Sequence, residues 1–138
     1  MRVIADTNLI VSAFLWGGNP RRVIDAARDG VFELCTSPAL LDELEGVVTR
    51  AKFEKQFVTL GFTPEELIAE FIGFATVIDA VPIGPVVIRD SDDDAVLACA
   101  IASESGVIVS GDNDLLDLKQ YQNIRILTAT ELLSELNL

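Results

Sequence analysis

Aspartates crowd one short stretch of this chain, where Asp90, Asp92, Asp93 and Asp94 directly precede the apolar run Ala95–Ala102. Helix capping explains one or two of them, because an acid in the first turn gains roughly 0.3–1 kcal/mol from the helix dipole. It does not explain four, because neighbouring carboxylates repel one another. Mg²⁺ and Mn²⁺ prefer oxygen ligands, so a bound cation would offset that repulsion. Taken alone, the cluster indicates either a helix cap or a cation site.

Three other segments carry acids in comparable positions. Asp6 ends an apolar run, Glu43 lies in the second turn of a helix expected after Ser37-Pro38, and Asp112 and Asp114 follow the run "VIVS". In a parallel sheet, the carboxyl ends of the strands and the starts of the following helices share one edge. We therefore expect all four segments to meet there, which favours a cation site over capping.

Single members of this set have simpler explanations. Asp6 could be only a turn residue, but the hydroxyl of Thr7 and the amide of Asn8 can hold its carboxylate in place. Glu43 could belong to a solvated helix face, although it lies beside the expected buried stripe of its helix. Asp112 could merely cap a turn between a strand and a helix. We favour the functional interpretation because the acids converge.

The layered fold that would bring the acids together is predicted by alternating strands and helices. Capping signals mark several helix starts, including Asn19-Pro20, Ser37-Pro38 and a capping box at Thr63. This alternation is typical of a parallel sheet covered on both faces, an α/β fold. A length of 138 residues suits one domain, 1–138. The expected strands are residues 2–6, 31–36, 76–81, 107–110 and 125–128.

Composition narrows the chemistry. The chain has no histidine, which excludes Ser-His-Asp catalysis and histidine-ligated metal sites. Cys35 and Cys99 each lie in an apolar segment, which predicts buried thiols rather than a disulfide. The net charge of −12 should repel nucleic acid unless a cation or a basic patch reverses the field. Arg21-Arg22 and the segment 50–55, with Arg50, Lys52 and Lys55, are the candidate patches.

Location and contacts can also be anticipated. No apolar run reaches the roughly 18 residues that span a bilayer, and Asp6 would interrupt a signal-peptide core. We therefore expect a cytoplasmic protein with no membrane association. Phe14 and Trp16 are expected in the core or in a subunit contact rather than as a platform for stacked bases.

Four motifs in order resemble the PIN-domain ribonucleases: "VIADTN", the acid in "SPALLDELEGVV", "DSDDDAVLACA" and "VIVSGDNDLL". The resemblance covers nearly the whole chain. It is closest to the VapC-like toxin components of toxin–antitoxin pairs, found in bacteria and archaea. The resemblance implies a five-stranded parallel sheet in the order 3-2-1-4-5 flanked by helices. It also implies cleavage of RNA that depends on Mg²⁺ or Mn²⁺.

The resemblance assigns roles to individual residues. The third acid of the family precedes an alanine by seven positions, which fits Asp93 with Ala100 and leaves Asp94 as a near alternative. The family often has threonine where this chain has Ser110. The implied catalytic and metal-binding residues are Asp6, Glu43, Asp93 and Asp112, with Thr7, Asn8, Asp90, Asp94, Ser110 and Asp114 as supporting or alternative residues.

The resemblance further implies a cognate antitoxin and a homodimer as partners. Two other functions remain as alternatives at this point. One is a catalytically silent PIN-fold module that only binds a partner. The other is a Mg²⁺-binding phosphoacceptor receiver domain, which is less favoured because Asp79 lies inside its expected strand and "SGDND" has no lysine.

Overall fold

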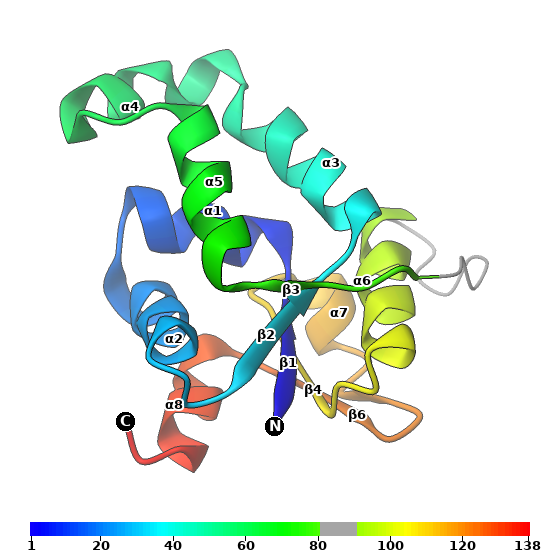
Figure 1. The fold of residues 1–138 in the computed structure, drawn as a ribbon. Coiled ribbons are helices and arrows are strands. Elements are labelled where there is room, and N and C mark those ends of the chain that lie inside the picture. The colour runs from blue at the N-terminus through cyan, green and yellow to red at the C-terminus, as the bar shows by residue number, and fades with distance from the viewer. Residues whose placement is uncertain (81–90) are drawn as a thin grey trace.

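The sheet is assembled from short strands that pair in the order β3-β2-β1-β4-β6-β5 (Figure 1). The computed structural model describes residues 1–80 and 91–138. Neighbouring strands are parallel except β5, which runs antiparallel to β6. The strands are β1 (Arg2–Ala5), β2 (Glu33–Thr36), β3 (Thr76–Val77), β4 (Val107–Val109), β5 (Gln120–Tyr121) and β6 (Ile124–Leu127).

The predicted α/β class is confirmed, and the parallel strands follow the predicted order, with β6 as the predicted fifth strand. The prediction of five strands is wrong by one, because it misses β5. That strand has only two residues and returns to β6 through Gln122, whose φ is 53°. Two residues are too few for an alternating pattern to be recognised. The third strand is also shorter than predicted. Ile78 still donates to the Thr36 carbonyl at 2.8 Å, but lies beyond β3.

The helices begin where local side chains satisfy their first N–H groups. Ser37 caps α3 by accepting from the Leu40 N–H, and Thr63 and Thr128 form capping boxes at α5 and α8. The helices are α1 (Thr7–Leu15), α2 (Gly18–Arg28), α3 (Pro38–Val48), the 3₁₀ helix η1 (Ala51–Phe53), α4 (Glu54–Leu60), α5 (Pro64–Phe74), α6 (Ser91–Ala102), α7 (Asn113–Leu116) and α8 (Ala129–Glu135).

Helix α2 begins earlier than the sequence predicts. Asn19 was expected to cap a helix from about Arg21, but α2 starts at Gly18 and no side chain caps it. The preceding Gly17 has a φ of 85°, a conformation that glycine adopts at little cost. The Asn19 amide instead donates to the Thr130 hydroxyl at 2.9 Å, which ties α2 to α8.

Apolar side chains form a core on each face of the sheet. Alternation along β1 sends Val3 and Ala5 into one core with residues of α1, α2, α3, α5 and α8, while Ile4 joins the other core with residues of α6. Cys35 and Cys99 are buried free thiols, as predicted. None of the helices in the described ranges has the length and apolarity that a membrane span requires.

Candidate metal and active site

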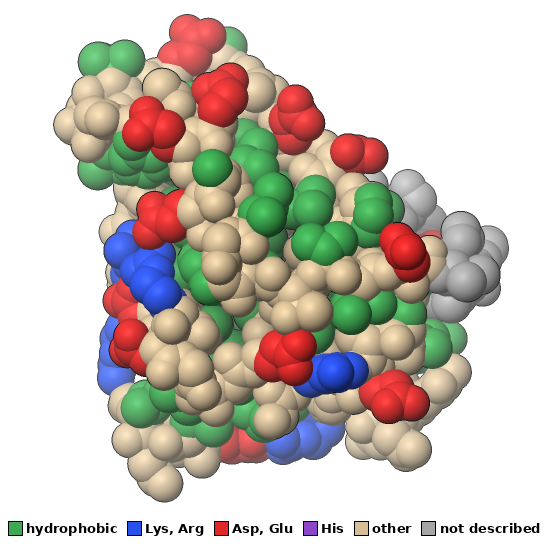
Figure 2. All heavy atoms as spheres, in the orientation of Figure 1, with side chains coloured by type: hydrophobic (Ala, Val, Ile, Leu, Met, Phe, Trp, Pro, Cys, Tyr) green, Lys and Arg blue, Asp and Glu red, His purple; other side chains and the backbone are tan. Residues whose placement is uncertain are grey.

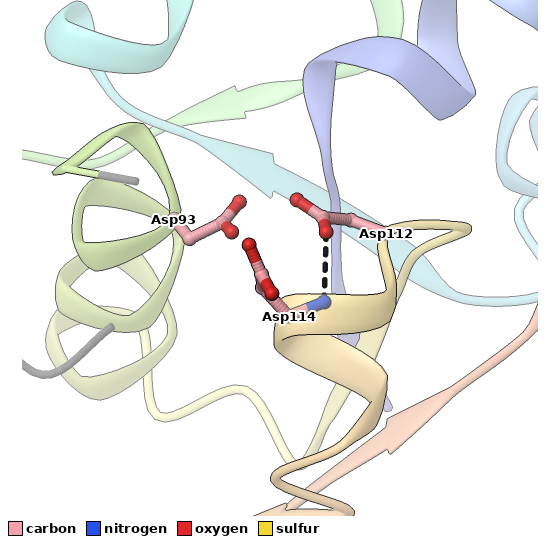
Figure 3. Close-up of side chains that lie close together, drawn as sticks. All are labelled: Asp93, Asp112 and Asp114. Atoms are coloured by element: carbon pink, nitrogen blue, oxygen red, sulfur yellow. Dashed lines mark hydrogen bonds between the residues drawn. The ribbon is translucent and has the colours of Figure 1, made fainter. Parts of the chain in front are cut away.

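Three carboxylates converge at the edge of the sheet where β4 ends. Asp93, Asp112 and Asp114 each offer an oxygen atom, and these atoms all lie within 4.8 Å of one another. Figure 3 shows the three side chains pointing toward one another, Asp93 from the start of α6 and the other two from the turn into α7. At such separations the negative charges repel, and a cation between them would relieve the repulsion.

Asp112 is oriented by the turn that it helps to form. It is the N-cap of α7, and its Oδ1 accepts from the Asp114 N–H at 2.9 Å (Figure 3). Its own N–H donates to the Ser110 hydroxyl at 2.9 Å. Capping, the simpler explanation considered for Asp112, is therefore confirmed. A carboxylate has two oxygens, so a cap does not prevent Asp112 from also binding a cation.

Asp6 lies in the interior beside this turn and is only 5% exposed. It follows β1 rather than ending it, and serves as the N-cap of α1 by accepting from the Leu9 N–H at 2.8 Å. Its other oxygen accepts a hydrogen bond from the Ser110 hydroxyl. Asp6 does not belong to the group of three, but Ser110 connects it to Asp112.

The remaining candidate residues occupy different positions. Asp93 is buried, while the adjacent Asp94 is half-buried and outside the group of three within the described ranges. Glu43 is also outside this group and lies half-buried on α3, which packs against α6. Thr7 is buried and Asn8 is exposed. Asp90, a supporting acid in the sequence interpretation, lies outside the described residues.

Asp114, which the sequence interpretation gave as a supporting or alternative residue beside Asp112, lies in the group of three. The available signal was the spacing of two residues in "DND". In a helix cap followed by a first turn, that spacing keeps both carboxylates near the same end of α7. The structure accordingly places both of them opposite Asp93.

An open pocket of about 700 Å³ adjoins the acids. One side is formed by Asn8 and Ser12 of α1, and Ser110, Asp112 and Asp114 contribute the end nearest the cluster. The start of α2 and the start of α8 complete the lining. A ligand in this pocket would therefore contact the acids from solvent.

The donor set suits a hard divalent cation. It consists of carboxylate oxygens, which Mg²⁺ and Mn²⁺ prefer over nitrogen or sulfur ligands. Cys99, on α6, does not supply a soft thiolate ligand. Burial raises the pKa of its thiol to about 11 and keeps it protonated at neutral pH.

Comparison with known proteins agrees with this architecture. The family model described as the PIN domain matches residues 2–114. The VapBC2 structure from Rickettsia felis, bound to a DNA fragment from its promoter, contains a chain similar to this one at 17% identity. The match covers 91% of this chain and 97% of that chain, with a TM-score of 0.63. FitAcB from Neisseria gonorrhoeae is similar at 16% identity over 93% of this chain and 98% of that chain, with a TM-score of 0.57.

These structural similarities establish a shared fold, and the comparison with curated proteins found no match. The family model accounts for most of the chain, from β1 to the α7 turn that carries Asp112 and Asp114. The protein is therefore a member of the PIN domain family.

Proposed function

We propose that the protein is a metal-dependent endoribonuclease and the toxin of a toxin–antitoxin pair. PIN domains are typically nucleases and generally use divalent metals. The observation that carries the proposal is the convergence of Asp93, Asp112 and Asp114, whose oxygens lie within 4.8 Å of one another beside an open pocket. Carboxylates repel one another at such separations, so a cluster of them is expected where the function requires a bound cation.

In this mechanism Asp93, Asp112 and Asp114 would hold Mg²⁺ or Mn²⁺. The bound cation would lower the pKa of a coordinated water and offset the charge of the phosphate under attack. Asp6 is fixed by the Leu9 N–H and the Ser110 hydroxyl, and adds a buried negative charge behind the cluster. Glu43 completes the proposed set of acids from α3. Histidine would not be needed, because a bound cation would activate the water.

The toxin assignment is supported by the architecture of its structural neighbours. The chain aligns over nearly its whole length with a chain of the Rickettsia felis VapBC2 structure. We accordingly propose a cognate antitoxin as the protein partner, RNA as the substrate and a homodimer as the assembly. A monomer in light scattering at tens of micromolar would contradict the homodimer alone.

The test compares two adjacent aspartates that differ in position. Asp93→Asn removes a charge from the cluster, while Asp94→Asn removes the same charge one residue away, about 100° around the helix. RNA cleavage is measured with Mg²⁺, with Mn²⁺ and with EDTA, and circular dichroism confirms folding. Loss of an outer residue around a metal typically costs 10–100-fold, so Asp93→Asn should reduce the rate by at least about 100-fold. Asp94→Asn should remain active.

Asp6→Asn is a second variant for the same cleavage test, because asparagine can still cap α1 while the charge is lost. We expect it to abolish cleavage without unfolding the protein. Full activity in the folded Asp6→Asn variant would remove Asp6 from the proposed set of acids. Folded wild-type protein that leaves RNA intact under every metal condition would instead favour the catalytically silent binding module.

A further inference from the structure

An exposed stripe on α1 leads away from the acids. Asn8, Ser12 and Trp16, the C-cap of α1, are spaced four residues apart. Asn8 and Trp16 are exposed and Ser12 is half-buried, while most of the helix is buried. Asn8 and Ser12 line the same pocket as Asp112. The helix begins beside Asp6, so at 1.5 Å per residue Trp16 lies roughly 15 Å from the acids along the helix axis. Asn8 and Ser12 thus lie between the acids and the indole along the helix.

Trp16 was expected in the core or in a subunit contact, and it does not lie in the core. Phe14 is buried, but Trp16 is 62% exposed. Its ring meets Phe53 edge-on, with centroids 5.8 Å apart and planes at 65°. The Gln56 amide donates to the Leu15 carbonyl at 2.8 Å, which anchors α4 to the end of α1. The indole of Trp16 therefore packs against Phe53 and is open to solvent.

A positive patch accompanies this aromatic pair. The Lys52 ammonium lies 5.0 Å from the centroid of the Phe53 ring, and Arg50 and Lys55 flank it in sequence. All three basic side chains are exposed, and within the described ranges none forms an ion pair. Other basic residues are neutralised by carboxylates, namely Arg2, Arg21, Arg28 and Arg125.

This patch stands out against an acidic molecule. The net charge is −12, and on the face drawn in Figure 2 acidic side chains are spread over the region of α3, α4 and α5. An anion approaching the acids would be repelled over much of such a surface. The segment 50–55, with three basic residues and one acid, Glu54, offers the local excess of positive charge that an acidic protein needs to bind nucleic acid.

We propose that the stripe and the patch form a binding track for single-stranded RNA. A base stacks on Trp16, Arg50 and Lys52 neutralise nearby phosphates, and the strand continues past Ser12 and Asn8 to the acids. The inference rests on the proposed nuclease function and adds how the substrate is held. A single strand is specified because a base pair inside a duplex has its faces covered, whereas an unpaired base can stack on an aromatic ring.

The chain carries its own reporter, because Trp16 is its only tryptophan. Wild-type protein in EDTA, where cleavage is not expected, is titrated with a single-stranded RNA oligonucleotide at low salt. Stacking should quench the Trp16 fluorescence to a saturable level. The same RNA annealed to its complement should cause no such quenching. Unchanged fluorescence while labelled single-stranded RNA binds would overturn the track.

Variants separate stacking from charge. Alanine replacement of a stacking residue typically costs enough to weaken binding about tenfold or more, which is expected for Trp16→Ala in fluorescence polarisation with labelled RNA. Trp16→Phe should restore most of the affinity. Val58→Ala is the matched surface control, because Val58 is 81% exposed on α4, and it should bind as wild type. Equal affinity of Trp16→Ala and wild type would contradict the proposal.

Two lysine variants test the role of positive charge in RNA binding. Lys52→Gln should weaken binding and reduce its dependence on salt, because one phosphate contact is lost. Lys119→Gln removes the same charge from an exposed position next to β5 and should have neither effect. Equal losses in the two variants would show a general charge effect and overturn the track.

Further outcomes distinguish a failure of the RNA-binding track from a failure of the proposed nuclease function. Trp16 emission that shifts on dilution of the protein, with no response to RNA, would identify a contact between copies and overturn the track. Cleavage of RNA without Trp16 quenching would overturn the track and leave the nuclease intact. Quenching by RNA without cleavage in any metal would support the track and refute the nuclease.

Discussion

Ser110 is the residue that links the two parts of the proposed site. Its side chain is almost fully buried, donates to the Asp6 carboxylate and accepts from the Asp112 N–H. A hydroxyl can do both at once, which an apolar side chain cannot. The residue thereby relates the acid after β1 to the turn after β4, although the two are 104 positions apart.

Ser110→Ala should therefore lower both stability and activity. The substitution leaves buried polar groups without their partner, which costs about 1–3 kcal/mol in the free energy of unfolding. Misplaced acids should slow cleavage by about 10–100-fold. Ser110→Thr keeps the hydroxyl and should retain most activity. Urea unfolding and RNA cleavage are the measurements, and an alanine variant equal to wild type in both would show that the link is dispensable.

The buried thiols give a second prediction at this scale. Burial raises the pKa of Cys99 from 9.0 to about 11, so the folded state favours the neutral thiol. The sign follows directly: this contribution to stability is complete below pH 9 and is lost as the pH rises toward about 11. In native protein at pH 8, Cys35 and Cys99 should react slowly with a thiol reagent, and both should react quickly in denaturant. Rapid reaction of both thiols in folded protein would contradict the burial.

At the scale of elements, the turn from β4 to α7 has two roles. Asp112 caps α7, and it also faces Asp93 and Asp114 across the cluster. The cap requires a side-chain oxygen, whereas a cation requires negative charge. Substitutions can therefore remove one role while keeping the other.

Asp112→Asn should preserve the cap and abolish cleavage, because asparagine caps helices about as well as aspartate. Asp112→Ala should abolish cleavage and also unfold more easily than Asp112→Asn, by about 1 kcal/mol. Thermal or urea unfolding of the two variants measures the difference. Identical stabilities would mean that the α7 cap contributes little, and an active Asp112→Asn would remove Asp112 from the ligand set.

At the scale of the whole molecule, charge and stability are coupled. A chain with a net charge of −12 repels itself when folded, and the repulsion is concentrated where three carboxylates meet. A cation that binds only the folded state stabilises it by mass action, by about 2.7 kcal/mol when its concentration is 100 times Kd.

Millimolar Mg²⁺ or Mn²⁺ should thus raise the melting temperature of wild-type protein by several degrees. Asp93→Asn should lose the shift, while the matched Asp94→Asn should keep it. Without metal, Asp93→Asn should melt no lower than wild type, because a source of repulsion is gone. Differential scanning fluorimetry measures these shifts, and equal shifts in wild type and Asp93→Asn would refute the metal site.

Local interactions explain what the sequence determined by itself. The short apolar runs of β1 and β4, the caps at Ser37 and Thr63, and an acid directly after a buried strand are properties of neighbouring residues. They predicted the α/β class and the edge at which the acids gather, because chain direction confines those ends to one side of the sheet. The order of the parallel strands was implied only by the resemblance to the PIN-domain family.

Only the tertiary structure decided which side chains meet. The placement of Asp114 beside Asp93 and Asp112, the exposure of Trp16 and the link from Ser110 to Asp6 all depend on segments far apart in the chain. Sequence spacing does not set the rotation of α6 about its axis or the packing of η1 and α4 against α1. Those follow from how the apolar faces fill the two cores, and a rotation of 100° exchanges one aspartate for the next.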